Sequence, residues 1–422
     1  MSLSAERWLS YLMIFFYMPV LSQETAPYSR YGLGEITPPY FTAQKGMGGL
    51  VAAYREPLQI NFLNPASYSA IRLTTLEAGA NFIHKNMHDA SSDRRYSTGN
   101  GFLDYIALGF PVSERSGISV GLIPYSKMNY AFRETQNVTG VGDIQKSYSG
   151  NGRLYQFYAG GAFRFPKADT TTNSFSIGLN AAYVFGTISR IDTFIFPDAA
   201  TYNNKVSTLV HMNNLALGTG IQYTRQLKKQ LQLTSGVYAL FPAYSNSRQE
   251  DLWERVLTFR TIDTIASASS RNKAVKTPVE VGAGLTVGKA GKWLAGADFY
   301  YKVWTAIPSF SPKAELKNSW EIHAGGEFIP NSQSFNFFRR TAYRMGIYYN
   351  SGHLQLYKEN IAEYGITFGI GMPIKTAFAR IHITMDIGQR GTLKNNLIKE
   401  TYYRAHVGFT LNDKWFIKRK YD

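Results

Sequence analysis

Six side chains in the C-terminal quarter of the sequence carry the charges or imidazole rings that ligand binding would need. Several are separated by even numbers of residues, so that they would share one face of an extended strand. Arginine binds carboxylates through paired hydrogen bonds, so these residues are candidates to hold the acidic group of a ligand. They are Arg344, Arg380, His382, Asp386, Arg404 and His406.

Catalytic and cofactor motifs are weak in this sequence. Gly117, Ser119 and Gly121 match the G-x-S-x-G string of a nucleophile elbow, but that motif requires a strand–turn–helix. Here apolar residues alternate with the string, which is typical of a strand interior. The chain has no Cys, no H-E-x-x-H and no P-loop, and its 7 His are scattered. We therefore expect no enzyme, no metal site and no cofactor.

The elements that would position these residues repeat with a period of two. Ile381, Ile383 and Met385, for example, alternate with His382 and Thr384. The apolar faces run for about 9–11 residues, the length of a tilted strand that crosses a membrane. In a soluble sandwich the polar faces would meet water, whereas a closed barrel is the only sheet that satisfies every backbone group in lipid. Such segments begin near residues 73, 102, 117, 152, 174, 209, 231, 277, 292, 319, 341, 361, 377 and 401.

The sequence therefore predicts an all-β fold, a transmembrane antiparallel β-barrel of about fourteen strands over residues 73–412. Inward charges in a barrel commonly pair with one another, and we favour that interpretation over ligand binding for any single candidate. If the last two strands pair symmetrically, Asp386 and Arg404 are cross-strand neighbours. Short connections would be periplasmic turns. We expect long external loops at 84–101, 136–147, 191–206, 248–276 and 390–400.

The ends and the composition of the chain fit export to an outer membrane. Residues 1–22 have the polar start, apolar run and small residue of a signal peptide, with an uncleaved anchor as the alternative. Residues 413–422 would form a periplasmic C-terminal extension. Charged residues are only 18% of the chain, against about 25% in soluble domains. Contact with anionic outer-membrane lipids accounts for the net charge of +16, and we expect no nucleic acid as a partner.

Residues 23–72 precede the first strand and lack its alternation. They are rich in Gly and Pro, which predicts compact irregular structure. A barrel of fourteen strands encloses more volume than its own side chains fill. We therefore interpret residues 23–72 as a hatch or plug in the lumen, with a disordered periplasmic tail as the alternative.

With Gly-Met-Gly-Gly at residues 46–49, Asn-Pro-Ala at residues 64–66 and about fourteen strands, the chain resembles the FadL/TodX family of outer-membrane transporters for hydrophobic compounds. The strings at 29–34 and 122–126 and the closing Trp415-Phe416 resemble the Bacteroidota branch of that family. The resemblance implies a hatch, an inward kink in the third strand and a lateral exit for ligand. Pro124 falls in the third strand, where a missing ladder hydrogen bond would produce the kink, unless it lies at a strand end. The residues that match the hatch motif are Gly46, Gly48, Gly49, Asn64, Pro65 and Ala66.

Two functions follow from these observations. The first is passive uptake of a hydrophobic, fatty-acid-like molecule or lipid through a hatch-plugged barrel, which the family resemblance implies. The alternative is a plugged barrel that acts as a scaffold in a larger outer-membrane export or assembly complex with protein partners. Uptake requires an apolar route to a side opening near Pro124. A scaffold requires an apolar patch outside the membrane, and the segment 248–276 is the best candidate because it holds Trp253, Val256, Leu257 and Phe259.

Overall fold

The computed structural model describes residues 26–414 apart from eight short gaps. The expected signal peptide lies outside the described residues, as does most of the expected C-terminal extension. The gaps are 166–172, 199–200, 258–259, 272–274, 306, 310, 312–313 and 375–377.

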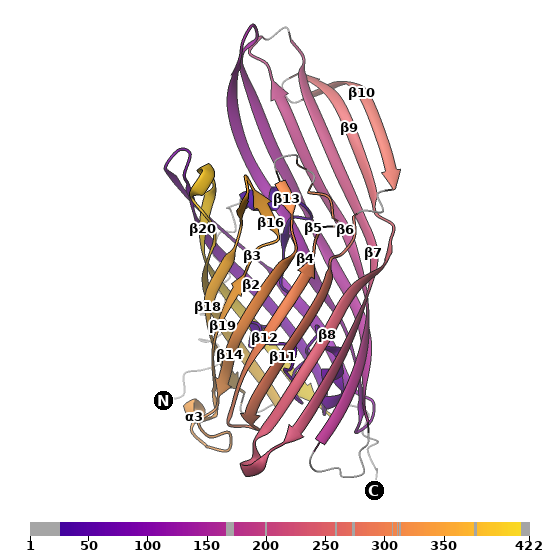
Figure 1. The fold of residues 1–422 in the computed structure, drawn as a ribbon, viewed down its shortest axis with the longest axis vertical. Helices are drawn as coiled ribbons and strands as arrows, with labels where there is room; N and C mark the ends of the chain where they lie inside the picture. The colour runs from indigo at the N-terminus through magenta and orange to yellow at the C-terminus, as the bar shows by residue number, and fades with distance from the viewer. Residues whose placement is uncertain are drawn as a thin grey trace, which may run out of the picture.

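Fourteen antiparallel strands form a closed barrel, which confirms the predicted fold (Figure 1). Each strand pairs with its neighbours along the chain, and the last strand pairs with the first over 16 residue pairs. The strands are β2 (Thr74–Asp89), β3 (Arg94–Pro111), β4 (Ser116–Val138), β5 (Gly142–Phe165), β6 (Asn173–Ile195), β7 (Asn203–Gln226), β8 (Gln232–Ser245), β11 (Val279–Lys289), β12 (Trp293–Val303), β14 (Ser319–Phe328), β15 (Ala342–Asn350), β18 (Glu363–Pro373), β19 (Phe378–Gly391) and β20 (Ile398–Asp413).

The two faces of the barrel differ as the period of two predicts. On β19, Ile383 and Met385 point outward and are 40% and 44% exposed, whereas His382 and Thr384 point inward and are each 1% exposed. Apolar outward side chains are suited to lipid. The inward side chains are buried because the lumen is filled.

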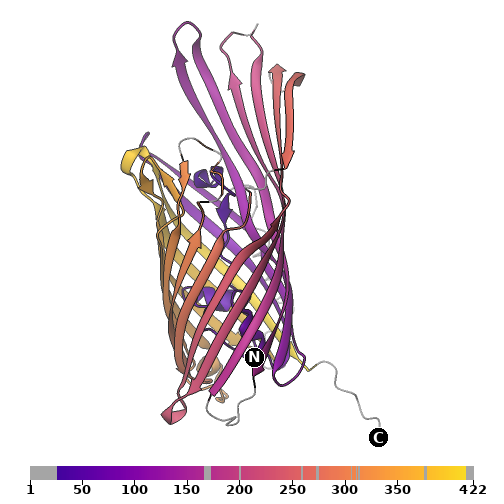
Figure 2. The ribbon, with the colours of Figure 1, turned by 45° about the vertical axis from the view of Figure 1, so that its right-hand side comes forward.

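Four of the expected external loops are wrong, because their residues continue the strands or add new ones. Cross-strand pairs run without a break to Asn137–Asp143 and to Phe194–Asn204, and the segment 248–276 contains β9 (Arg248–Leu257) and β10 (Arg260–Arg271). Water meets both faces of these strands, so the sequence shows no apolar face there. The upper parts of β4–β7, with β9 and β10, rise above the opposite rim as a sheet that we call the wall (Figures 1 and 2).

Residues 26–73, which we call the N-terminal segment, lie inside the barrel (Figure 2). They begin near the end that carries the wall and reach β2 at the opposite end. Met47, Leu50, Val51 and Ala52 are completely buried. Among the described residues, no helix is long and apolar enough to cross a membrane. The elements of the segment are η1 (Pro27–Arg30), β1 (Glu35–Ile36), α2 (Thr42–Lys45) and η2 (Pro65–Ala70).

The remaining elements are short and lie between the barrel strands. Three of them form a small sheet that packs on the start of the N-terminal segment, where Tyr28, Leu33, Leu316 and Leu354 share one buried cluster. This cluster covers the lumen below the wall. The elements are β13 (Ala314–Leu316), β16 (Leu354–Leu356), β17 (Glu359–Asn360), η3 (Lys228–Gln230), α3 (Phe337–Arg340) and η4 (Lys394–Asn396).

Candidate functional site

The glycines of the first part of the hatch motif (Gly46, Gly48 and Gly49, here called the first motif) let the N-terminal segment lie directly against the barrel strands. Gly48 and Gly49 follow α2 and its C-cap Gly46, with positive φ angles of 72° and 92° that an L side chain rarely adopts. A Cβ on Gly48 would lie 2.8 Å from the carbonyl oxygen of Ile347. The Gly48 N–H donates to the Thr367 hydroxyl at 2.9 Å.

The second part of the hatch motif (Asn64, Pro65 and Ala66, here called the second motif) lies at the start of η2 and packs against glycines of nearby barrel strands. The Asn64 side chain accepts a hydrogen bond from the N–H of Ala66 at 3.2 Å, and it donates to the carbonyl of Ala52 at 2.6 Å. A Cβ on Gly220 would lie only 2.1 Å from the Asn64 side-chain oxygen, and one on Gly236 only 1.9 Å from the Ala52 oxygen. The strands therefore need glycine where the segment touches them.

One carboxylate of β12 anchors the turn between the two motifs. The Asp298 carboxylate accepts the N–H groups of Val51 and Ala52 at 2.7 and 2.8 Å, and the Tyr300 hydroxyl at 2.6 Å. Tyr300 also lies 2.9 Å from the carbonyl of Gly49. These bonds satisfy backbone donors that would otherwise be buried without a partner.

Three of the six candidates form ion pairs within the lumen. Asp386 and Arg404 are cross-strand neighbours whose side chains lie 3.0 Å apart, as the symmetric hairpin predicted. Arg404 also contacts Glu363 at 3.0 Å. Arg344 lies near the other end, where it donates to Glu327 at 2.7 Å.

The remaining candidates are distributed over separate clusters. His382 contacts Arg344 at 3.0 Å and the Thr410 hydroxyl at 3.1 Å. His406 lies 3.4 Å from the Lys45 ammonium, and Arg380 is placed toward the end of the barrel opposite the wall. The six residues therefore do not form one ligand-binding site.

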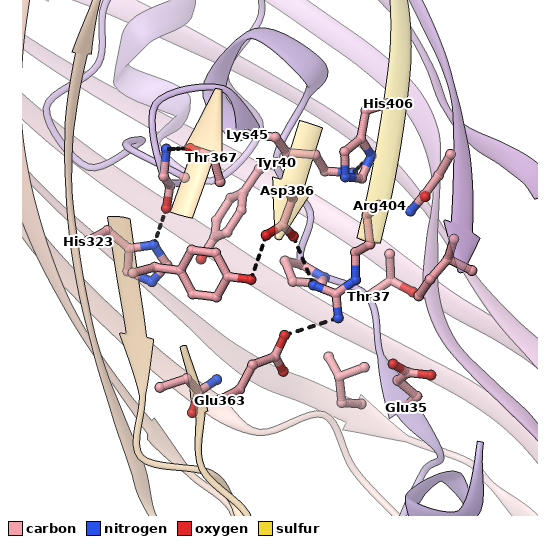
Figure 3. Close-up of a pocket in the computed structure, with 18 of the residues that line it drawn as sticks. Glu35, Thr37, Tyr40, Lys45, His323, Glu363, Thr367, Asp386, Arg404 and His406 are labelled. Carbon is pink, nitrogen blue, oxygen red and sulfur yellow. Dashed lines mark hydrogen bonds and ion pairs between the residues drawn. The ribbon is translucent and has the colours of Figure 1, made fainter. Parts of the chain in front are cut away.

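A cavity of about 100 Å³ separates the N-terminal segment from the strands (Figure 3). Its lining combines apolar side chains such as Ile83 and Phe102 with charged groups that include the Asp386–Arg404 pair. Burial opposes ionisation of Glu35 there, but Lys85, Lys127 and Arg390 outweigh it and hold the pKa of this carboxyl well below its ordinary value. Lys85 lies 2.8 Å from Glu35.

Enzymatic and metal chemistry find no support in the described part of the chain. The Ser119 hydroxyl lies 3.0 Å from the Tyr158 hydroxyl, and Ser119 sits inside β4 with no helix after it. No group of three His, Asp or Glu side chains among the described residues is placed to hold a metal ion.

Pro124 lies at a bulge in β4, the third barrel strand. Pairing of β3 with β4 ends at Ile106–Leu122, and the β4–β5 register shifts between Pro124 and Ser126. Beyond this point β1 of the N-terminal segment pairs with β4, through Glu35–Lys127 and its neighbour. A proline cannot donate a ladder hydrogen bond, which is compatible with the departure of β3.

The fold is shared with solved channels for hydrophobic compounds. The toluene transporter TodX of Pseudomonas putida gives a TM-score of 0.60 at 12% identity, covering 89% of this chain and 99% of that one. A Pseudomonas aeruginosa FadL homologue gives 0.56 at 13% identity over 90% and 100%. The monoaromatic hydrocarbon channel CymD gives 0.56 at 12% identity over 89% and 98%. At these identities the likeness shows the fold alone.

Sequence comparison decides the family. No curated protein matches the chain, but the sequence model of one family, BamG, matches residues 6–422. The chain belongs to the BamG family. The solved channels described above show that this member of the BamG family has a FadL/TodX-type barrel, which confirms the resemblance at the level of the fold.

Sequence reasoning missed the charged pairs that hold the N-terminal segment of this BamG chain. Lys45 of α2 forms a buried ion pair with Asp104 of β3, and Glu35 pairs with Lys85 of β2. A signal was available in β2, where Glu77 and Lys85 fall on the inward face of the alternation. The partners in the N-terminal segment gave none, because that segment has no periodicity.

Proposed function

We propose that residues 1–22 export this chain to an outer membrane, where the N-terminal segment acts as a hatch and the barrel serves as a scaffold in a larger export or assembly complex. We further place it in the Bacteroidota branch, which the strings at 29–34 and 122–126 support.

The wall is the observation that carries the scaffold proposal. Its outermost strand, β10, has every side chain exposed over 12 residues and, among the described residues, pairs only with β9. Charged residues and two register irregularities protect this edge in part, but no strand covers it. Addition of a strand is a common mode of protein recognition. A protein partner would give β10 the pairing that it lacks.

The wall also offers an apolar hollow beside this edge. A cavity of about 490 Å³ is lined by residues that include Phe194, Trp253 and Ile265. Trp253 and Leu257 are exposed as the patch hypothesis requires, but Val256 is only 4% exposed, and Phe259 lies outside the described residues. Large exposed apolar patches commonly mark interaction sites.

The lumen supports a closed barrel rather than an open path for apolar molecules. Its cavity of about 100 Å³ is lined by charged groups such as Glu35, Asp386 and Arg404. Ligand pockets for small molecules usually measure about 300–1,000 Å³, so this cavity is too small to serve as a path for a fatty-acid-like molecule.

Passive uptake of a hydrophobic, fatty-acid-like molecule is the second candidate function, and a hollow beyond Pro124 on β4 favours it. A hollow of about 510 Å³ lies where β3 leaves β4, and Asn100, Met128 and Arg153 are among its lining residues. The Phe102 ring lies 4.8 Å from the Lys127 ammonium across this region. A membrane ligand could enter or leave sideways here.

Purification of the tagged full chain from native outer membranes in mild detergent distinguishes the two functions. We expect protein partners in stoichiometric amounts with the wild type, and their loss in an Ile262→Lys/Ile265→Lys variant, since these residues are 46% and 51% exposed. A Phe335→Lys control changes a fully exposed residue between β14 and α3, at the end of the barrel opposite the wall, and should retain the partners. A lone barrel with a bound fatty-acid-like ligand would support uptake, and a lone empty barrel would refute the scaffold.

A further inference from the structure

A cationic pocket opens at the end of the barrel opposite the wall. It has a volume of about 280 Å³ and lies between the N-terminal segment, five barrel strands and the β11–β12 turn. Its basic lining residues come from separate elements: Arg55 and Arg72 from the N-terminal segment, Arg164 from β5, and Lys289 and Lys292 from the β11 end and the turn that follows.

The carboxylates of this pocket do not balance its positive charge. Glu56 and Glu327 are the acidic residues in the lining, and Glu327 is already paired with Arg344 at 2.7 Å. Among the described residues, none of the five basic side chains forms an ion pair with a carboxylate. The five basic side chains of the lining therefore carry more positive charge than its two carboxylates can balance.

Neutral hydrogen bonds hold the guanidinium groups in place. Arg72 and Arg164 both donate to the carbonyl oxygen of Glu114, at 3.1 and 2.8 Å. Arg55 donates to the Ser69 hydroxyl at 2.9 Å and to the Gln222 side chain at 3.2 Å. These bonds fix three like charges around one space and leave some donors free to bind an anion.

The electrostatic cost of this arrangement is visible at Arg55. Burial, together with the neighbouring Arg164 and Arg72, lowers the pKa of its guanidinium to about 9. An anion in the pocket would relieve both causes, because it would pair with the buried charge and screen the repulsion.

We propose that this pocket binds the carboxylates of an acidic peptide segment from a periplasmic partner. The pocket lies on the lumen side of the strands, whereas bilayer lipids contact their outward faces. Its basic groups come from several elements around a space larger than one oxyanion, which fits a series of acidic side chains. The site lies at the opposite end from the wall and does not depend on the proposed scaffold role.

Fluorescence anisotropy with a labelled hexaglutamate peptide tests the proposal on the detergent-purified full chain. We expect saturable binding at low salt, weakened at least about 10-fold in an Arg164→Gln/Lys292→Gln variant. An Arg248→Gln/Arg271→Gln variant removes two charges from exposed residues of the wall and should bind as the wild type does. Heat-modifiable migration in gels verifies that each barrel is folded.

A gain-of-affinity variant keeps the test decisive if the double variant does not fold. Glu56→Gln removes the one unpaired carboxylate of the pocket, and at pH 8, above the Glu56 pKa of about 7, we expect it to bind the peptide several-fold more tightly than the wild type does. Absence of peptide binding to the wild type, or equal affinity for all variants, would overturn the proposal. Displacement of the peptide by inorganic phosphate or phosphatidylglycerol vesicles at lower concentration than by unlabelled peptide would also overturn it, in favour of a phosphate ligand.

Discussion

Replacement of Asp298 by alanine should release the turn that holds the N-terminal segment in the lumen. This carboxylate accepts the N–H groups of Val51 and Ala52 at 2.7 and 2.8 Å, and both residues are completely buried. Tyr300 would keep its contact with the Gly49 carbonyl at 2.9 Å. The variant therefore leaves two buried backbone donors without an acceptor.

The expected effect follows from these two bonds. A hydrogen bond to a charged group contributes about 1.5–3 kcal/mol, so the two together contribute about 3–6 kcal/mol to the docking of the turn. A difference of about 1.4 kcal/mol is tenfold in an equilibrium constant. Opening of the turn should therefore become about 10²- to 10⁴-fold more frequent in Asp298→Ala. Asp298→Asn keeps one acceptor oxygen, so the frequency of opening in this variant should lie between those of the wild type and Asp298→Ala.

Hydrogen exchange followed by mass spectrometry measures this opening directly. Peptides that cover Val51 and Ala52 should lose protection by the expected factor, while strand peptides of the barrel keep theirs. Thr224→Ala is the matched control, because the Thr224 hydroxyl contacts only Thr234 of the neighbouring strand, at 3.2 Å. Unchanged protection of these peptides in Asp298→Ala would refute the assignment of Asp298 as an anchor.

Three further changes test other contacts of the N-terminal segment. Lys45→Met should lower the unfolding free energy by about 3 kcal/mol, because it removes the lysine partner of buried Asp104 and leaves only His406 at 3.6 Å; urea titration of heat-modifiable migration measures it. Gly346→Ala should displace the segment, since the new Cβ would lie 2.1 Å from the Gly48 nitrogen, and exchange protection around Gly48 should fall. Burial, and then Glu327, raises the pKa of Glu56 from 4.5 to about 7, so the Tm should fall as the pH rises from 4.5 to 7, and Glu56→Gln should remove this dependence.

Each of these has a control that the chain itself provides. A Lys45→Met/Asp104→Leu variant removes both charges and should be more stable than Lys45→Met alone. Gly161→Ala places its Cβ 3.5 Å from the nearest side chain and should behave as the wild type. A Tm that declines with pH equally in wild type and Glu56→Gln would assign the titration to another group.

The membrane-spanning part of the fold could be predicted because lipid imposes a pattern on the sequence. On β19 and β20 every second residue must be apolar, so the alternation located both strands, and the register across one hairpin then placed Asp386 opposite Arg404. The wall could not be predicted in this way. Both of its faces meet water, so β9 and β10 resemble loop sequence.

The filling of the lumen was only partly accessible from the sequence. The glycines of the first motif and Asn64 indicated a packed segment, but the strand residues that receive them are far away in the chain. Lys45 and Asp104 are 59 positions apart, and Glu35 and Lys85 are 50 apart. No periodicity links such partners, because their meeting is set by the volume left inside the barrel.

The pairing of β2 with β20 closes the barrel and so constrains the order in which the parts of this chain fold. The N-terminal segment is enclosed by the β19–β20 hairpin, and Glu35 lies 3.6 Å from Arg390 only when that hairpin is in place. Either the barrel closes after the N-terminal segment is in place, or that segment must enter a barrel that is already closed. A chain truncated before residue 378 would lack the last two barrel strands, β19 and β20, and with them the groups that hold the N-terminal segment in place.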